Sequence, residues 1–257
     1  MKILKLANLK TVVASWSGGI DSTAVVAHLL IRGYSVKTFS LNFYNEAMMA
    51  REKMARERLL PYLQNLGPIV HAEASIEMSE FLWSFSPDGV EIPRRNKHIM
   101  DWMITKKMMP KGIYNLAMGE YVGADTWVVR DHVSERDADA RHLEAYLLHE
   151  YGSDYQLFTL RDFGPCRFKS ERLQLGLDAL GSDFILTTNC MDQMQVRDHC
   201  GVCYKCIERA AAFSSINVPD GTRYIKDPRK HPYYGFYMKQ MNGDGVEVRG
   251  TWEDFQS

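Results

Sequence analysis

Apolar and polar positions along the chain fall into two alternating kinds of segment. Short runs rich in β-branched residues predict strands at residues 11–16, 36–43, 69–74, 114–119 and 184–188, with a further short one at 156–160. Helical spacing of apolar residues predicts helices at residues 22–32, 46–66, 99–109, 142–151, 169–180 and 206–213. Strands that alternate with helices indicate an α/β fold, so we expect a doubly wound, mostly parallel five-stranded sheet. After residue 219, prolines and aromatic residues predict an irregular tail packed on the surface.

The first predicted strand ends in a glycine turn, and a helix begins directly after it. Gly18 and Gly19 can adopt positive φ and let backbone N–H groups approach an anion closely. The free N–H groups and the dipole of the helix start add about half a positive charge there. Ser17, Ser22 and Thr23 can donate hydroxyl hydrogen bonds to phosphate oxygens. The stretch therefore predicts a phosphate site, and the alternative is an ordinary capped turn that binds nothing.

A second chemical signal is a group of thiols near the end of the predicted fold. Four thiolates at these spacings can surround one zinc ion as a tetrahedron, and a closed set of this kind favours a structural role. An iron–sulfur cluster is the alternative, and His199 could replace one thiol. Cys166 lies outside the group and is expected to be an incidental thiol rather than a nucleophile. The predicted metal ligands are Cys190, Cys200, Cys203 and Cys206.

The composition limits the cellular setting. The 257 residues are 46% hydrophobic, which is enough for one α/β domain with a small appendage. A net charge of −1 gives no general attraction to nucleic acid. We see no apolar run of membrane-spanning length and no signal peptide, and bunched cysteines suit a reducing compartment, so we expect a cytoplasmic protein without a membrane partner. We also expect a homodimer.

Two charged segments are candidates for substrate contacts. Arg94, Arg95, Asn96 and Lys97 precede a predicted helix, where the dipole disfavours cations, so a bound anion would explain them. Residues 125–141 carry many charges of both signs after a predicted strand, as a substrate loop or lid would.

Two motifs together carry a resemblance to a known family. Residues 17–22 read Ser-Gly-Gly-Ile-Asp-Ser, which resembles the PP-loop of the ATP-pyrophosphatase superfamily. With the cysteine pattern, the chain resembles the 7-cyano-7-deazaguanine synthase (QueC-type) family over about residues 12–209. The resemblance implies an adenine nucleotide α-hydrolase-like (HUP) domain over residues 1–188 and a C-terminal zinc-binding helical region over residues 189–257. It also implies ATP, Mg²⁺ and Zn²⁺ as cofactors.

The resemblance implies a reaction and a role for each matching residue. Enzymes of this family adenylate 7-carboxy-7-deazaguanine with ATP, release pyrophosphate, and use ammonia to form the amide and then the nitrile preQ0, in queuosine-type biosynthesis. The chain would therefore be an ATP-dependent carbon–nitrogen ligase. Its catalytic residues would be Asp21, Arg95 and Lys169, and its substrate contacts Arg95, Asn96, Asp131 and Asp137. Its nucleotide contacts would be Ser15, Ser17, Gly18, Gly19, Asp21, Ser22, Thr23, Asn42 and Gly119.

The chain departs from the family in ways that leave its acceptor open. Residues 42–45 read Asn-Phe-Tyr-Asn where the family has Asp-Tyr-Gly-Gln, and Arg94 stands where a glycine is expected. The alternatives are a divergent enzyme that acts on another deazapurine or on a macromolecule, a tRNA-thiolating enzyme that uses Cys166, and a non-catalytic nucleotide- and zinc-binding module.

Overall fold

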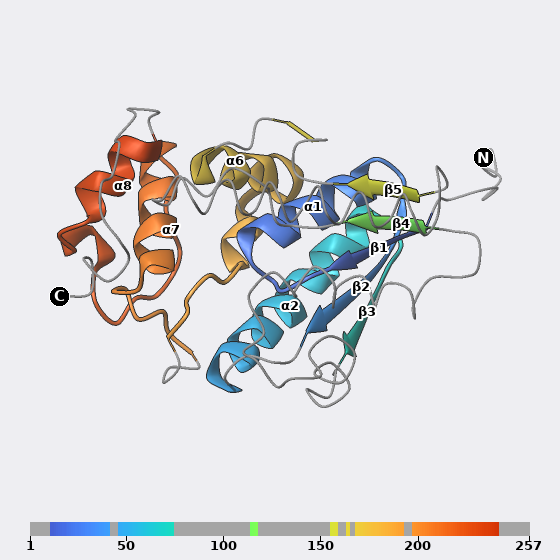
Figure 1. Ribbon diagram of the computed structural model, residues 1–257, viewed down its shortest axis with the longest axis horizontal. Coiled ribbons are helices and arrows are strands. Elements are labelled where there is room, and N and C mark those ends of the chain that lie inside the picture. Colours follow the sequence, from blue (N-terminus) through green and yellow to red (C-terminus); the bar gives the residue numbers. More distant parts are fainter. Residues whose placement is uncertain are drawn as a thin grey trace, which may run out of the picture.

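The computed structural model describes residues 11–41, 46–74, 114–117, 155–158, 163–164, 168–192 and 197–241 (Figure 1). These residues form a parallel sheet with helices packed against it, in agreement with the predicted α/β class. The helices predicted at 99–109 and 142–151, which would cover the sheet in a doubly wound fold, lie outside the described residues.

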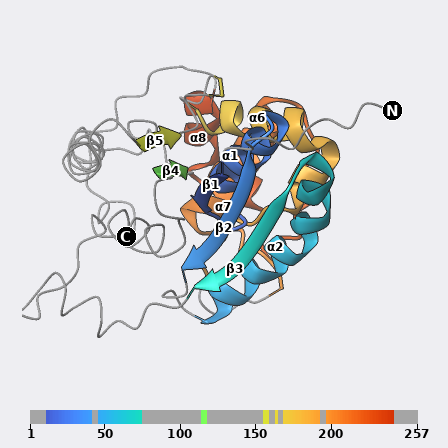
Figure 2. The same cartoon turned by 90° about the vertical axis from the view of Figure 1, so that its right-hand side faces the viewer.

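The strands are all parallel and run in the order β3-β2-β1-β4-β5. Figure 2 shows β2 and β3 side by side at one edge. The centre of the sheet is apolar on both faces, as parallel sheets require, since Val12, Val13 and Ala14 are at most 1% exposed. The strands are β1 (Thr11–Ser15), β2 (Ser35–Leu41), β3 (Ile69–Ala74), β4 (Tyr114–Ala117) and β5 (Tyr155–Phe158).

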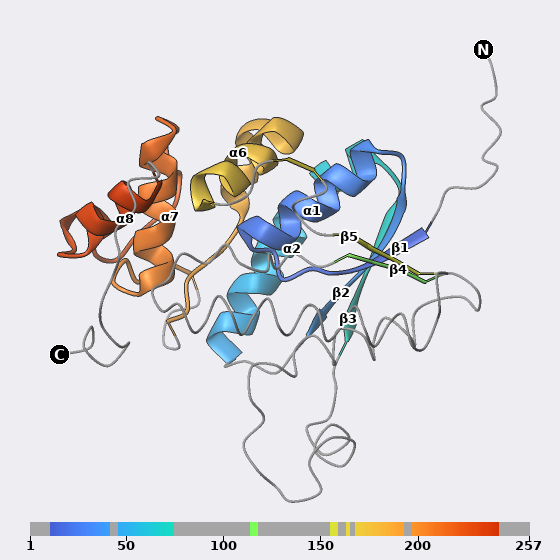
Figure 3. The same ribbon diagram turned by 45° about the horizontal axis from the view of Figure 1, so that its top comes forward.

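The first two helices lie on the same face of the sheet. α1 (Ile20–Ile31) connects β1 to β2, and α2 (Glu46–Leu66) connects β2 to β3. Both connections step toward the same edge of the sheet, and because such crossovers are right-handed, both helices lie on one side of it (Figure 3). The chain then returns to the other side of β1, where β4 pairs. The strand order therefore reverses beside β1, and ligands of open parallel sheets bind at such a point beyond the carboxyl ends of the strands.

The later helices extend the same core away from the sheet. α6 (Lys169–Leu180) packs on α1, α7 (Tyr204–Ser215) packs on α6, and α8 (Tyr234–Met241) packs on α7 (Figures 1 and 3). One buried apolar cluster joins Trp16 and Ile20 to Phe184, Phe213 and Tyr237. This core continues across residues 188 and 189, and the division predicted there remains a prediction.

Two sequence predictions were wrong in this region. Residues 184–188, predicted as a strand, instead belong largely to the 3₁₀ helix η2 (Gly181–Leu186), because Gly181 at φ +58° turns the chain back and Phe184 packs fully buried against α6. The tail predicted as irregular contains α8, whose Tyr237 and Met241 are buried one turn apart in the common core. Among the described helices, none has the length and hydrophobicity needed to cross a membrane.

The packing of η2 on α6 can be tested with one methyl group. A Cβ at Gly176 would lie 1.9 Å from Cζ of the buried Phe184 ring, so Gly176→Ala should lower the free energy of unfolding by about 1–3 kcal/mol through overpacking. Gly235, in α8, has nothing within 4 Å of such a Cβ. Gly235→Ala should therefore be neutral or stabilising by about 0.5–1 kcal/mol. Urea unfolding of both variants checks this, and equal effects would contradict the packing.

Candidate functional site

The glycine turn after β1 is held closely by α2 and by the segment after η2. Gly18 has φ +82°, and a Cβ there would lie 3.0 Å from the Glu52 carbonyl oxygen and 3.2 Å from Cγ of Arg56. The Gly18 carbonyl oxygen accepts a hydrogen bond of 3.0 Å from the backbone N–H of Thr188. Only glycine combines this conformation with so close an approach of α2.

The two serines of the turn face each other, whereas the neighbouring threonine faces the core. Ser17 Oγ and Ser22 Oγ lie 3.1 Å apart, and the Gly19 N–H donates to Ser17 Oγ at 3.3 Å. Thr23 is fully buried, and its hydroxyl oxygen accepts a 3.0 Å hydrogen bond from Trp16 Nε1. Ser15 is the last residue of β1 and pairs in register with Phe39. The serine hydroxyls therefore belong to the turn itself, and the Thr23 hydroxyl joins α1 to β1.

An ion-pair group brings together two helix starts that are far apart in the sequence. Lys169 Nζ donates to Asp21 Oδ2 at 2.6 Å, and Arg172 Nη1 donates to Asp21 Oδ1 at 3.4 Å. The side chains of Lys169 and Arg172 are only 2% and 3% exposed, and that of Asp21 is 24% exposed. α6 begins at Lys169, where the Glu171 carboxylate accepts the Phe168 N–H at 3.0 Å. This cap and the ion pair place Lys169 beside the first turn of α1.

The opposite charges of this group counteract the effect of burial on the pKa values of Asp21 and Lys169. Burial alone would raise the pKa of Asp21, but the positive charges of Lys169 and Arg172 hold that pKa well below its usual range. Burial lowers the pKa of Lys169, and the negative charges of Asp21 and Glu208 oppose that shift. Glu208 also lies 3.6 Å from Lys205 Nζ. Cations of α6 and α7 thus gather next to the glycine turn.

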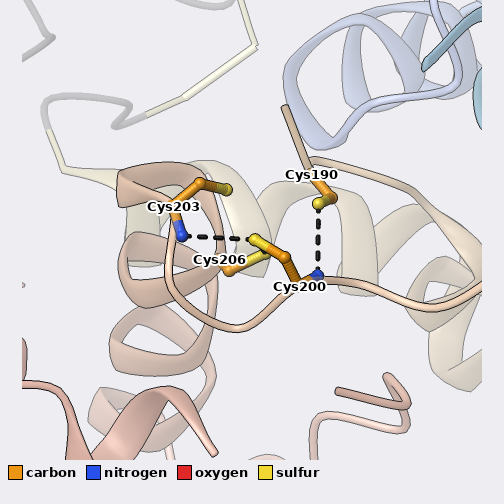
Figure 4. Close-up of side chains that lie close together, drawn as sticks. All are labelled: Cys190, Cys200, Cys203 and Cys206. Carbon is orange, nitrogen blue, oxygen red and sulfur yellow. Dashed lines mark hydrogen bonds between the residues drawn. The ribbon is translucent and has the colours of Figure 1, made fainter. Parts of the chain in front are cut away.

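The four predicted thiols come together at the start of α7 (Figure 4). Their sulfur atoms all lie within 4.8 Å of one another, and the Sγ atoms of Cys200 and Cys206 are 3.9 Å apart. Backbone N–H groups donate to two of the sulfurs, from Cys200 to Cys190 Sγ at 3.4 Å and from Cys203 to Cys200 Sγ at 3.3 Å. All four are free cysteines. Tetrahedral thiolates at about 2.3 Å from one ion lie about 3.8 Å apart, so the cluster can hold a single metal ion such as zinc.

His199, the alternative ligand, lies outside this group of four. Its Nε2 is 3.0 Å from the hydroxyl of Thr188, and its ring meets the Tyr224 ring edge-on. Burial and the charge of Arg209 lower the pKa of His199 to about 3, so the ring is neutral at physiological pH.

A three-residue segment connects the thiols to the glycine turn. Thr188 bonds Gly18, and Asn189 Oδ1 accepts the Ile20 N–H at 3.4 Å. Cys190 follows directly, and its carbonyl oxygen accepts a 3.1 Å hydrogen bond from Arg51 of α2. The metal-ligand cluster and the turn are therefore joined through residues 188–190.

The structure adds four residues to the site that sequence reasoning did not select: Arg56, Arg172, Thr188 and Asn189. Arg172 had a signal, because it stands three residues after Lys169 on the same predicted helix face. Nothing in the sequence indicates the hydrogen bond from the Thr188 backbone N–H to the Gly18 carbonyl oxygen. The predicted site residues Asn42, Arg95, Asn96, Gly119, Asp131 and Asp137, together with Cys166, lie outside the described residues and remain predictions.

Metal content tests the thiol cluster. We expect about one metal ion per chain, and removal by a chelator should lower the thermal unfolding midpoint because metal binding stabilises the folded state. Cys203→Ser should reduce the bound metal measured by elemental analysis, whereas Cys166→Ser should leave it unchanged. Equal metal content in both variants would contradict the assignment of these ligands.

Acid titration tests the Asp21 ion pair. Asp21→Asn leaves Lys169 without its carboxylate, so at pH 7 the variant should be less stable by about 2 kcal/mol. The pKa of Asp21 is depressed in the folded state, so this stabilisation is present above the ordinary aspartate pKa of 3.8. It is lost as the pH falls below that value. Urea unfolding from pH 7 to pH 3 should therefore show a constant difference that shrinks below about pH 4. The exposed Asp178→Asn is the control, and a difference that does not change with pH would refute the pairing.

The comparisons with known proteins agree with these motifs. No protein-family model matches the chain. A 7-cyano-7-deazaguanine synthase of Ectopseudomonas mendocina is 28% identical over 232 residues, which cover 84% of this chain and 99% of that protein. Proteins of the same name from Legionella pneumophila and Rickettsia conorii are 26% and 23% identical, over 85% and 84% of this chain and 98% and 99% of their own lengths. The chain is therefore a homologue of the curated 7-cyano-7-deazaguanine synthases, the family that its glycine turn and its cysteines resemble.

Proposed function

We propose that the chain is an enzyme of 7-deazaguanine biosynthesis that uses ATP to activate a carboxylate and ammonia to convert it to an amide or nitrile. The acceptor would be 7-carboxy-7-deazaguanine or a closely related acid. The observation that carries the proposal is the convergence of Lys169, Asp21 and the Ser-Gly-Gly turn at the point where the strand order reverses. The curated homologues, matched over nearly their whole length, support the substrate class.

The turn is suited to receive the leaving pyrophosphate. The acceptor carboxylate would attack the α-phosphorus of ATP, and the bond from that phosphorus to the bridging oxygen would break. Pyrophosphate would leave with the electron pair toward the N–H groups and hydroxyls of the turn. Ammonia would then attack the activated carbonyl carbon and displace AMP, which gives the amide. For the nitrile, the amide oxygen would attack a second ATP in the same way, and that oxygen would leave with AMP as the nitrogen loses its two protons. Lys169 supplies a buried positive charge beside the first turn of α1, where charge on the phosphates develops.

Asp21 has two roles in this proposal. It holds Lys169 and Arg172 in place through its two carboxylate oxygens. It is also the residue that would hold Mg²⁺, directly or through water, since it stays ionised and its side chain is 24% exposed. When bound, Mg²⁺ would neutralise charge on the phosphate oxygens.

Zinc is the metal that fits the thiol cluster. Four sulfurs within 4.8 Å of one another suit one tetrahedral ion, whereas a multi-iron cluster would place several atoms between its cysteine ligands and hold them further apart. A site closed by four thiolates leaves no open position for substrate. The ion would therefore stabilise the start of α7 and the segment from Thr188 to Cys190 beside the turn.

Product analysis tests the reaction. The protein is incubated with MgATP, ammonium and 7-carboxy-7-deazaguanine, and mass spectrometry should detect the amide or nitrile together with AMP and pyrophosphate. Lys169→Met should lower kcat/KM by about 100-fold, because it removes a buried cation aimed at developing charge. Lys239→Met, at an exposed position of α8, should have no effect. Formation of ADP would rule out the scheme, and tight ATP binding without pyrophosphate release from any carboxylate would favour a non-catalytic module.

A further inference from the structure

A buried arginine of α2 contacts the side of the glycine turn that faces this helix. Arg56 is 3% exposed, and its Nη1 donates to the Ser17 carbonyl oxygen at 3.3 Å. Its Cγ is one of the atoms that a Cβ at Gly18 would meet, so the arginine stem packs directly on the turn. Arg56 is thus placed to control the conformation of the Ser17–Gly18 peptide.

The direction of this hydrogen bond determines the direction of an amide of the turn. In a trans peptide the C=O group and the following N–H group point to opposite sides. Arg56 draws the Ser17 carbonyl toward α2, so the Gly18 N–H points away from α2. The N–H of Thr188 holds the Gly18 carbonyl, and the Gly19 N–H points back to Ser17 Oγ. The N–H groups of Ser17 and Ile20 also donate within the protein, to Ser22 Oγ and Asn189 Oδ1, so the Gly18 N–H is the amide of the turn that is directed toward an anion.

Arg56 is itself fixed by a carboxylate at the end of β3. Its Nη2 donates to both carboxylate oxygens of Glu73, at 2.8 and 3.0 Å, and Ser40 Oγ donates to Glu73 Oε2 at 2.5 Å. Burial would raise the pKa of Glu73, but the hydrogen bonds from Ser40 and Arg56 lower it to about 2. Glu73 is therefore ionised at physiological pH, and its two oxygens together hold Arg56 Nη2 while Arg56 Nη1 is left to contact the turn.

Two other groups lie near the pair, and neither replaces it. Glu52 Oε2 is 3.9 Å from Arg56 Nη1, a longer contact than those of Glu73. His71 Nε2 is 3.3 Å from Glu73 Oε1, and burial together with the charge of Arg56 lowers the pKa of His71. Glu73 is therefore the carboxylate that orients Arg56.

We propose that Arg56, oriented by Glu73, is a positioning residue that aims the Gly18 N–H at the pyrophosphate group of the nucleotide. Arg56 acts through the Ser17 carbonyl and does not itself touch the ligand. The proposal rests on the proposed function, because it assumes that the glycine turn binds pyrophosphate. The proposal predicts that both residues of this ion pair, Arg56 on α2 and Glu73 on β3, affect the affinity for pyrophosphate.

The test measures binding of magnesium pyrophosphate to the full chain by calorimetry. Glu73→Ala and Arg56→Met should each weaken binding by about tenfold or more, the effect of losing one oriented charge-assisted hydrogen bond. Arg56→Lys keeps a donor for the Ser17 carbonyl and should restore part of the affinity. Glu57→Ala and Arg58→Met, at exposed positions of the same helix, are the matched controls and should bind as the unmodified chain does.

Metal content and the thermal midpoint are measured for every variant to separate positioning from folding. Arg56→Met removes a buried charge, so Glu73→Ala is the decisive variant, since the Glu73 side chain is 38% exposed and the thermal midpoint reports the cost of leaving Arg56 without this partner. Unchanged pyrophosphate affinity in Glu73→Ala would overturn the inference and leave the proposed function standing. If the unmodified chain does not bind pyrophosphate, the proposed function fails and the inference fails with it.

Discussion

Burying a lysine cation is costly unless a counter-charge lies against it, and the pairing of Lys169 with Asp21 is the contact on which the site depends. The two residues are 148 positions apart in the sequence. Their contact places the start of α6 beside the start of α1, so that two helix N-termini and a buried cation lie next to one glycine turn. The packing of α6 on α1 and the electrostatics of the site are therefore set by the same contact.

The strongest sequence predictions rested on local signals. The sequence predicted β1, the glycine turn, α1 and the four-thiol cluster, because strand, turn and metal-ligand patterns involve residues that are close in the sequence. The orientation of Thr23 was also readable in principle. It stands three residues after Ile20 and four before Ala27, on the same side of α1 as these two apolar residues, so its side chain is expected to face the core.

The sequence predictions were wrong, or missed a contact, where tertiary contacts override local secondary-structure preference. The apolar residues at 184–186 are typical of a strand, yet they form a 3₁₀ helix in which Phe184 packs against Gly176. α8 follows a stretch of prolines and aromatic residues, and its two buried apolar side chains, Tyr237 and Met241, belong to a core contributed mainly by other elements. Arg56 looked like one more charge on an amphipathic helix, since nothing in its neighbourhood predicts a partner on β3.

The bond between Thr188 and Gly18 has a consequence for biosynthesis. The ribosome delivers the chain from its N-terminus, so the Ser-Gly-Gly turn emerges before Thr188 and Asn189. Its partners emerge much later, and the contact from Ile20 to Asn189 spans 169 positions. Closing so long a loop costs entropy that only the docked C-terminal helices can offset. In a chain that stops before residue 188, the Ser-Gly-Gly turn therefore lacks both the backbone contact of Thr188 and the side-chain contact of Asn189.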